Sequence, residues 1–476
     1  MGTTEYGKDY RTFTPRYPLL SRGAVLWVLD LAFAMFFWAA TVAFLFYGSL
    51  PQTWMIASVV LLPPAAFLLF LYAFGLYRRP ALLETRRSFG RILLAAGLTG
   101  LLTTASAAIV SRSPDAPRPE ALCVAALLSL PLAGVAARIG LYTICRRGLF
   151  HRRILIVGAG RRAWDLAWLL QHQGNTLSYD LMFAAVSSMG EVDPRLAHDP
   201  RHRILPASQG FLAVARQFDA DQIVVAPDER RGTDIEALLA CKSAGFPVSE
   251  YLTFLEREIR RVDLKCPDLS WLLYADDFTI GPIDRALKRC VDVVASAALL
   301  VLTAPFLLAA AAAVKLQDGG PILYRQTRVT LHGRKFRILK LRSMGVEAER
   351  NGIVWAMVDD PRITRVGSIL RQSRLDELPQ LLNVLRGDMS FVGPRPERPE
   401  FVTELAAKLP LYHQRHLVKA GLTGWAQVNY PYGASLNDAR SKLSYDLYYA
   451  KNFSIVFDIL IILQTIRVIL WPDGVR

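Results

Sequence analysis

Residues 291–314 read VDVVASAALLVLTAPFLLAAAAAV, an apolar run long enough for a helix to cross a bilayer. Basic residues flank both ends: Arg285, Lys288 and Arg289 before it, and Lys315, Arg325 and Arg328 after it. Because basic flanks stay on the cytoplasmic side, both ends are expected there. Pro305 removes one backbone donor near the middle and favours a bend. The run is therefore predicted to be a re-entrant helix over 286–316. An ordinary kinked span is the alternative, since proline is tolerated in spanning helices.

Four further apolar runs, each long enough to span a membrane as a helix, cover residues 24–47, 54–77, 92–110 and 121–145. Basic residues gather before the first run, between the second and third, and after the fourth. By the positive-inside rule, both ends of this bundle face the cytoplasm. A cleaved signal peptide does not fit, because the first run is too long and no small-residue cleavage site follows it.

Composition agrees with a membrane protein that has a basic cytoplasmic part. The chain has 476 residues, 52% of them hydrophobic, and a net charge of +15. That hydrophobicity excludes a disordered chain, and five scattered cysteines without a CxxC pair indicate reduced thiols rather than a disulfide scaffold. Residues 281–476 carry 27 Lys+Arg and 17 Asp+Glu, so most of the excess positive charge lies there. Segregated apolar and basic regions favour a membrane protein over a nucleic-acid binder, and no nucleic-acid partner is expected.

A small α/β domain is predicted after the bundle. Residues 153–160 read RILIVGAG, a short buried strand and a glycine turn, and a helix is expected over 164–171. Further strands at 181–186 and 222–226 alternate with helices at 211–218 and 233–244. As a cofactor motif the pattern is weak, because Ser187-Ser188-Met189 offers no acid for a ribose hydroxyl. A packing domain with a vestigial fingerprint is favoured over a nucleotide-binding one.

The predicted organisation is therefore an α-helical membrane bundle of four spans (1–150), a Rossmann-like α/β domain (151–255), a linker (256–280) and a last domain (281–476). In that last domain, residues 373–387 read SRLDELPQLLNVLRG. Leucines at helical spacing predict a helix that ends at Gly387, with Pro379 in its first turn. This would place Asp376 at the N-cap and Glu377 just inside. Two adjacent acids at such a site can divide the work, one attacking or accepting a proton and the other holding Mg²⁺. Plain helix capping is the alternative.

Cations and a stiff loop accompany these acids. Residues 325–342 hold seven basic residues and no acid: Arg325, Arg328, Arg334, Lys335, Arg337, Lys340 and Arg342. Such a patch beside a membrane-inserted helix can hold lipid headgroups or phosphorylated substrates, although a solvated basic face is the alternative. In Gly393-Pro394-Arg395-Pro396, two prolines hold an arginine on an extended loop suited to an oxyanion. An ordinary tight turn is the other reading of that loop.

Several motifs in one order resemble the bacterial sugar transferases, the polyprenyl-phosphate hexose-1-phosphate transferases. They are KLRSM at 340–344, DPRITRVG at 360–367, LDELPQ at 375–380, GDMSFVGPRP at 387–396 and GWAQVN at 424–429. The bundle and the α/β domain resemble the long members, which start exopolysaccharide, capsule or O-antigen units. The resemblance implies an α+β catalytic domain on the cytoplasmic face of the bacterial inner membrane, anchored in membrane lipid by the re-entrant helix. A homodimer is compatible with it.

The resemblance also assigns roles. Asp376 would attack the β-phosphate of a UDP-hexose and release UMP, after which polyprenyl phosphate takes the sugar phosphate from the enzyme. Glu377 would hold Mg²⁺, and Lys340 and Arg395 would bind phosphate oxygens. Further candidates for phosphate binding are Arg328, Arg342 and Arg374; the expected structural prolines are Pro305, Pro394 and Pro396. Ala304 and Ala420 depart from the serine and proline usual in the family.

The sequence is also compatible with other donor sugars and with other functions. UDP-glucose and UDP-galactose are the expected donors, but no motif reads the hydroxyl that separates them, and N-acetylated sugars stay open. A membrane-anchored nucleotide-sugar dehydratase would share the N-terminal half, yet no tyrosine here has a lysine four residues on. A silent assembly scaffold would be expected to lack the two acids. The apolar run 453–471 is interrupted by polar residues, which favours an interfacial helix over a sixth span.

Overall fold

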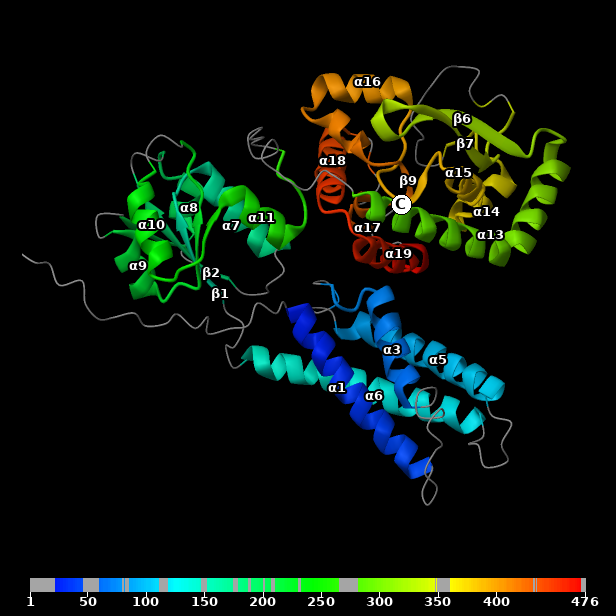
Figure 1. The fold of residues 1–476 in the computed structure, drawn as a ribbon, viewed down its shortest axis with the longest axis horizontal. Coiled ribbons are helices and arrows are strands. Elements are labelled where there is room, and N and C mark those ends of the chain that lie inside the picture. Colours follow the sequence, from blue (N-terminus) through cyan, green and yellow to red (C-terminus); the bar gives the residue numbers. More distant parts are fainter. Residues whose placement is uncertain are drawn as a thin grey trace, which may run out of the picture. The chain divides into compact units, whose positions relative to one another are not determined.

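The computed structural model describes residues 22–45, 60–78, 81, 85–110, 119–146, 152–173, 179–186, 190–199, 202–206, 210–229, 233–264, 281–346, 348, 360–430, 433 and 435–471. Two compact units contain them, Met1–Arg260 and Arg261–Arg476 (Figure 1). The expectation about residues 187–189 lies outside the described residues. So do residues 54–59 of the second predicted span.

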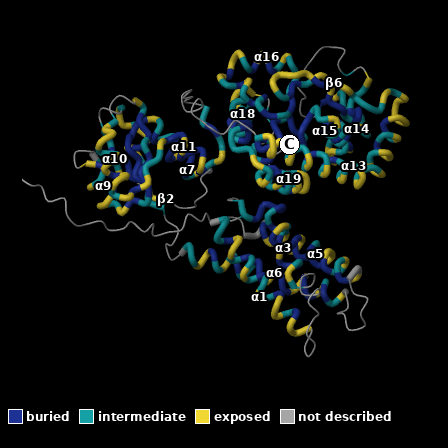
Figure 2. Tube along the Cα trace, in the orientation of Figure 1, coloured by how far each residue is buried: buried dark blue, intermediate teal, exposed yellow. Residues whose placement is uncertain are grey.

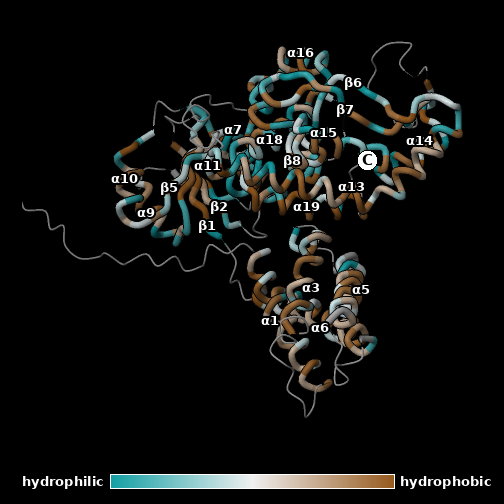
Figure 3. Tube along the Cα trace, turned by 45° about the vertical axis from the view of Figure 1, so that its right-hand side comes forward, coloured by the Kyte–Doolittle hydropathy of each residue, from teal (hydrophilic) through white to brown (hydrophobic). Residues whose placement is uncertain are grey.

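In the described part of the N-terminal bundle the helices are α1 (Arg22–Leu45), α3 (Leu62–Ala73), α5 (Thr85–Val110) and α6 (Pro119–Arg146). Of these, α1, α5 and α6 are long and apolar enough to cross a membrane, and α3 is a shorter apolar helix. Trp38 and Phe67 are buried between the helices, whereas Phe36, Phe44 and Leu128 are exposed. Exposed apolar side chains of this kind suit helices that face lipid (Figures 2 and 3).

The predicted Rossmann-like domain is a five-stranded parallel sheet in the order β3-β2-β1-β4-β5. Its strands are β1 (Arg152–Val157), β2 (Tyr179–Ala185), β3 (Arg203–Pro206), β4 (Gln222–Val225) and β5 (Val248–Glu250). Helices α7 (Arg161–Gln173) and α11 (Tyr251–Ile259) lie on one side of the sheet, and α9 (Phe211–Phe218) and α10 (Ile235–Ser243) on the other (Figure 1). A short helix, α8 (Pro194–His198), precedes β3. The sequence patterns did not reveal β3 and β5, because both are short and carry polar residues.

The second unit mixes helices with two small sheets, β6 (Leu323–Val329) with β7 (Lys335–Leu341), antiparallel, and β8 (Ser390–Val392) with β9 (Gly421–Thr423), parallel. Its helices are α13 (Pro282–Asp318), α14 (Arg365–Gln372), α15 (Gln380–Arg386), α16 (Pro399–Lys408), α17 (Trp425–Asn429), α18 (Leu436–Lys451) and α19 (Ile455–Leu470). The described residues of this unit also form the 3₁₀ turns η5 (Leu331–Gly333), η6 (Leu375–Glu377) and η7 (Tyr412–Leu417). Leu381, Val392, Trp425 and Tyr449 lie in one apolar core. Val262, from the predicted linker, also packs in this unit.

Helix α13 contains the predicted re-entrant segment and is bent along its length (Figures 1 and 3). Pro305 lies inside this helix. Both halves are bound to the same unit. In the first half, Lys288 donates to Asp458 of α19 at 2.6 Å. At the far end, Asp318 pairs with Arg342, just after β7. The bend allows both ends of a 37-residue helix to contact one compact unit.

The outer side of the bend is apolar. We call Val301, Leu302, Phe306 and Leu308 the apolar bend; Val301 and Leu302 are 76% and 72% exposed. A water-facing surface rarely gathers large apolar side chains in this way, so these residues suit a segment placed in lipid. Insertion and return to the same side of a membrane remain a prediction.

Helix α19 also exposes apolar residues and buries polar residues. Asp458, Gln464 and Arg467, which interrupt the apolar run, are buried, and Arg467 donates to the carbonyl of Val428 at 2.8 Å. Val456 and Ile469 are exposed instead. The polar residues therefore face the protein and apolar residues face outward, as expected of a helix that lies on a membrane surface.

Candidate active site

Asp376 and Glu377 lie in the 3₁₀ turn η6, directly before α15. The sequence placed Asp376 at a helix N-cap, and this is wrong: α15 begins at Gln380 and its N-cap is Pro379. The reason is that Pro379 has no N–H with which to bond the Leu375 carbonyl in α-helical fashion. That carbonyl accepts instead from the N–H of Leu378 at 3.3 Å. The predicted helix end is confirmed, because Gly387 caps α15 in a left-handed conformation.

The Glu377 carboxylate holds two cations on one oxygen. Lys340 Nζ, from β7, donates to Glu377 Oε1 at 2.9 Å, and Arg395 donates to the same atom at 2.8 Å. Only 14% of the Glu377 side chain is exposed. Burial alone would raise its pKa, but the charges and hydrogen bonds of Arg395 and Lys340 outweigh burial and hold the pKa of Glu377 well below its usual value.

Asp376 has a different environment from its neighbour. It is buried, and burial followed by the negative charge of Glu377 raises the pKa of Asp376 above the usual value. The charges of Lys340, Arg371 and Arg374 oppose that rise in pKa. Within the described part of the chain its carboxylate accepts no hydrogen bond. The pair thus consists of one firmly ionised acid bound to cations and one less stabilised carboxylate beside it.

The loop that carries Arg395 is fixed by close backbone contacts. A Cβ on Gly393 would lie 2.2 Å from the Lys419 carbonyl oxygen, so only glycine allows this approach of the β8 and β9 segments. The N–H of Gly421 donates to the Pro394 carbonyl at 2.9 Å. On the other side of the arginine, Arg328 donates to the Pro396 carbonyl at 3.1 Å. Both predicted prolines therefore supply carbonyls that hold the loop in place.

A buried ion pair also holds the loop that carries Arg395. Arg415 donates to the Arg395 carbonyl at 3.0 Å and to Asp446 of α18 at 2.7 Å. The sequence patterns assigned no role to Arg415 or to Asp446. The signal for Asp446 was an acid on the buried stripe of α18 that contains Leu443 and Leu447. A charge at such a position needs a partner.

Not every predicted phosphate ligand lies beside the acids. Arg342 is buried and donates to Asp318 at 2.8 Å, so it joins β7 to the end of α13. Arg328 is bound to the Arg395 loop through Pro396, as described above. Arg374 is exposed, has a positive φ of 59°, and its charge acts on Asp376. Lys340 and Arg395 are thus the predicted cations that the structure brings onto Glu377.

A divalent cation fits this site only if substrate phosphates supply further oxygen ligands. Among the residues that the structure describes, no three His, Cys, Asp or Glu side chains are grouped as a metal site. Mg²⁺, however, is commonly held by one or two carboxylates together with substrate phosphates and water. Glu377 with Asp376 meets that minimum, and the oxygen-only donor set suits Mg²⁺.

Several known proteins are similar to this chain. The family model described as bacterial sugar transferase matches residues 283–472. A UDP-N-acetylgalactosamine-undecaprenyl-phosphate N-acetylgalactosaminephosphotransferase of Aeromonas hydrophila is 46% identical over 262 residues, which are 55% of this chain and 61% of that protein. A UDP-glucose:undecaprenyl-phosphate glucose-1-phosphate transferase of Caulobacter vibrioides is 45% identical over 200 residues, 41% of this chain and 75% of that protein. The exopolysaccharide production protein PSS of Rhizobium leguminosarum bv. phaseoli is 42% identical over 193 residues, 39% of this chain and 95% of its own length.

Proposed function

The chain belongs to the bacterial sugar transferase family, and we propose that it transfers a sugar 1-phosphate from a UDP-sugar to polyprenyl phosphate, the first step of building a surface polysaccharide. The observation that carries this proposal is the adjacent acid pair, in which Lys340 and Arg395 converge on Glu377 and leave Asp376 beside them. Two relatives carry names with undecaprenyl phosphate as the acceptor but with different sugars. The donor is therefore proposed as a class, UDP-hexoses or their N-acetylated forms.

The reaction has two displacements at one phosphorus atom. In the first, an oxygen of the Asp376 carboxylate attacks the β-phosphorus of the UDP-sugar. The bond from that phosphorus to the bridging oxygen breaks, UMP leaves with the electron pair, and an aspartyl phosphosugar forms. In the second, an oxygen of polyprenyl phosphate attacks the same phosphorus, the bond to Asp376 breaks, and the carboxylate is restored. The product is a polyprenyl diphosphate sugar.

Lys340 and Arg395 supply charge stabilisation in both steps. Phosphoryl transfer depends mainly on positioning and on neutralising the negative charge on phosphate oxygens. An arriving diphosphate would compete with Glu377 for these two cations and would meet them already in place. Mg²⁺, held by Glu377 together with the phosphates, would neutralise further charge on the leaving group.

The apolar bend of α13 and the outer side of α19 support a membrane location for this chemistry. A polyprenyl chain stays in the bilayer, so the enzyme that transfers a sugar phosphate onto the phosphate at its end must lie at the membrane surface. The basic flanks of α13 favour the cytoplasmic face of the inner membrane.

The proposal is tested with the full chain in lipid nanodiscs, polyprenyl phosphate, Mg²⁺ and a panel of UDP-sugars. One or more donors are expected to release UMP, and Asp376→Asn is expected to abolish that release. With labelled donor and without polyprenyl phosphate, the wild type in nanodiscs should carry a phosphosugar on the peptide that contains Asp376. Glu404→Gln, at an exposed ion pair with Lys408, is the matched control and should retain activity. Unchanged UMP release by Asp376→Asn would show that Asp376 is not the nucleophile.

A further inference from the structure

The glycine turn between β1 and α7 is already occupied by a carboxylate of this chain. In dinucleotide-binding domains the pyrophosphate lies on the backbone N–H groups at the start of the helix that follows this turn. Here the N–H groups of Arg161 and Arg162 donate to the two oxygens of Asp228 at 2.7 and 2.9 Å. Asp228 lies in the segment after β4.

The glycines of the turn accommodate that segment rather than a ligand. A Cβ on Gly160 would lie 2.1 Å from the Asp228 carboxylate. Gly158 has a φ of +112°, and its Cβ would lie 2.6 Å from the Ala226 carbonyl oxygen. Gly190 also has a positive φ, of +117°, and its Cβ would contact the Asp228 side chain at 3.3 Å. In a cofactor site these missing side chains make room for pyrophosphate, and here they make room for residues 226–228.

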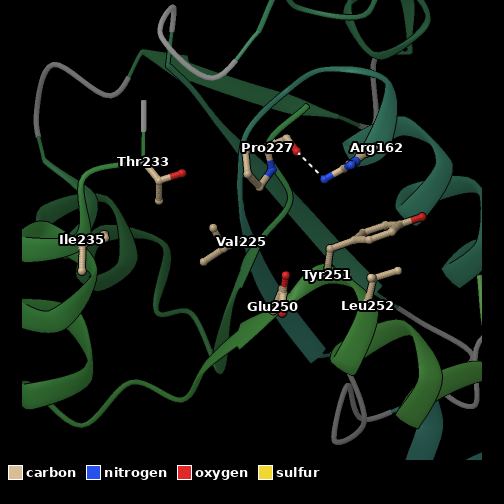
Figure 4. A pocket seen from close by; sticks show the side chains of 8 residues that line it. All are labelled: Arg162, Val225, Pro227, Thr233, Ile235, Glu250, Tyr251 and Leu252. Atoms are coloured by element: carbon tan, nitrogen blue, oxygen red, sulfur yellow. Dashed lines mark hydrogen bonds between the residues drawn. The ribbon is translucent and has the colours of Figure 1, made fainter. Parts of the chain in front are cut away.

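The cation at the start of α7 is also bound internally. The Arg162 guanidinium donates to the Pro227 carbonyl at 3.1 Å (Figure 4). A cavity of about 480 Å³ lies next to this contact. Apart from Arg162, its lining comes from β4, β5 and the segments that follow these strands, with Val225, Glu250 and Tyr251 among the lining residues. The glycine turn does not contribute to it.

We propose that Asp228 is an internal anion that occupies the phosphate position of the Rossmann-like domain, so that this turn binds no dinucleotide and serves to hold the segment after β4 onto α7. The helix N-terminus then stabilises a carboxylate of its own chain, as it would stabilise a phosphate. This explains why a glycine turn persists without the ribose-binding acid. It also removes the structural basis for a nicotinamide-dependent reaction in this domain.

The test uses amide hydrogen exchange of the peptide that contains residues 161–165 in the full chain, with inorganic pyrophosphate as the probe. Asp228→Gly is expected to exchange roughly fivefold faster, the factor that corresponds to loss of a helix cap. Pyrophosphate should restore slow exchange in Asp228→Gly, because it fills the vacated position. It should have no effect on the wild type or on Asp228→Asn, whose side chain fills the same space.

The matched control is Asp234→Gly, which removes the cap of α10, where Asp234 accepts from the N–H of Ala237 at 3.0 Å. Exchange at α10 should accelerate in this variant and pyrophosphate should not restore it. Failure of pyrophosphate to protect Asp228→Gly would overturn the proposal. Slower exchange of the 161–165 peptide in the wild type at saturating NAD or pyrophosphate would overturn it as well, and this measurement requires no variant to fold.

Discussion

Lys340 and Arg395 donate to one oxygen atom of Glu377, although they come from different parts of the chain. Lys340 lies in β7, and Arg395 lies in the loop after β8. A single, partly buried carboxylate therefore sets the distance between two cations before any substrate arrives. Phosphoryl transfer depends on charges held in position, so two cations fixed on one carboxylate are suited to stabilise phosphate oxygens.

Lys340→Met and Arg395→Met should each lower kcat/KM for UMP release by about a hundredfold, the usual effect of removing one group that stabilises charge in a transition state. The double variant should lose less than the product of the two effects, because both cations act through the same oxygen and the same phosphates. A double-mutant cycle on UMP release measures this coupling.

Lys408→Met is the control for the loss of a positive charge, because Lys408 forms an exposed ion pair with Glu404. It should leave kcat/KM nearly unchanged. If the Lys340 and Arg395 effects multiply without any coupling, the two cations do not act as a unit.

Sequence patterns predicted the parts of this fold that depend on local periodicity. Apolar runs predicted α1, α5 and α6, and the strand before the glycine turn predicted a parallel α/β domain. The start of α15 was misjudged because the leucine spacing includes Leu378, whereas the missing N–H of Pro379 delays the helix to Gln380. Periodicity alone does not register the loss of one backbone donor.

The pairing of charged side chains was harder to predict, because it is set by tertiary structure. Lys340 and Arg342 belong to one basic run, and alternation along a strand would place them on the same face. However, β7 ends at Leu341, so Arg342 turns to Asp318 while Lys340 reaches Glu377. No spacing in the sequence indicates that break.

Gly393→Ala should destabilise the second unit by more than about 2 kcal/mol and abolish activity, because the new Cβ would overlap the Lys419 carbonyl and push β8 from β9. Displacement of β8 would also move Arg395. Thermal unfolding and UMP release of the full chain in nanodiscs measure the two effects. Gly345→Ala is the control, because its Cβ would meet nothing within 4 Å. Equal stability of the two variants would contradict the close approach.

The bend of α13 predicts that both of its ends lie on one side of the membrane. Ile283→Cys and Leu316→Cys place thiols at exposed positions near the two ends, in a chain whose native cysteines are replaced. A membrane-impermeant maleimide should label both thiols in inside-out vesicles and neither in intact spheroplasts. Opposite labelling of the two positions would establish a spanning helix instead. The Leu302→Cys thiol, on the apolar bend, should resist the reagent in both preparations.

His416 should make the second unit sensitive to acid. Burial, and then the positive charges of Arg415 and His413, lower the pKa of His416 to about 3, against about 6.5 in the unfolded chain. Between these values the unfolded state binds the extra proton, so stability is full above about pH 6.5 and falls by up to about 1.4 kcal/mol per pH unit as the pH drops. In His416→Gln the decline in melting temperature from about pH 6.5 to about pH 4.5 should therefore be shallower than in the wild type. His413→Gln, which changes an exposed histidine, should keep most of the wild-type slope. Identical slopes for His416→Gln and the wild type would show that acid destabilisation comes from other groups.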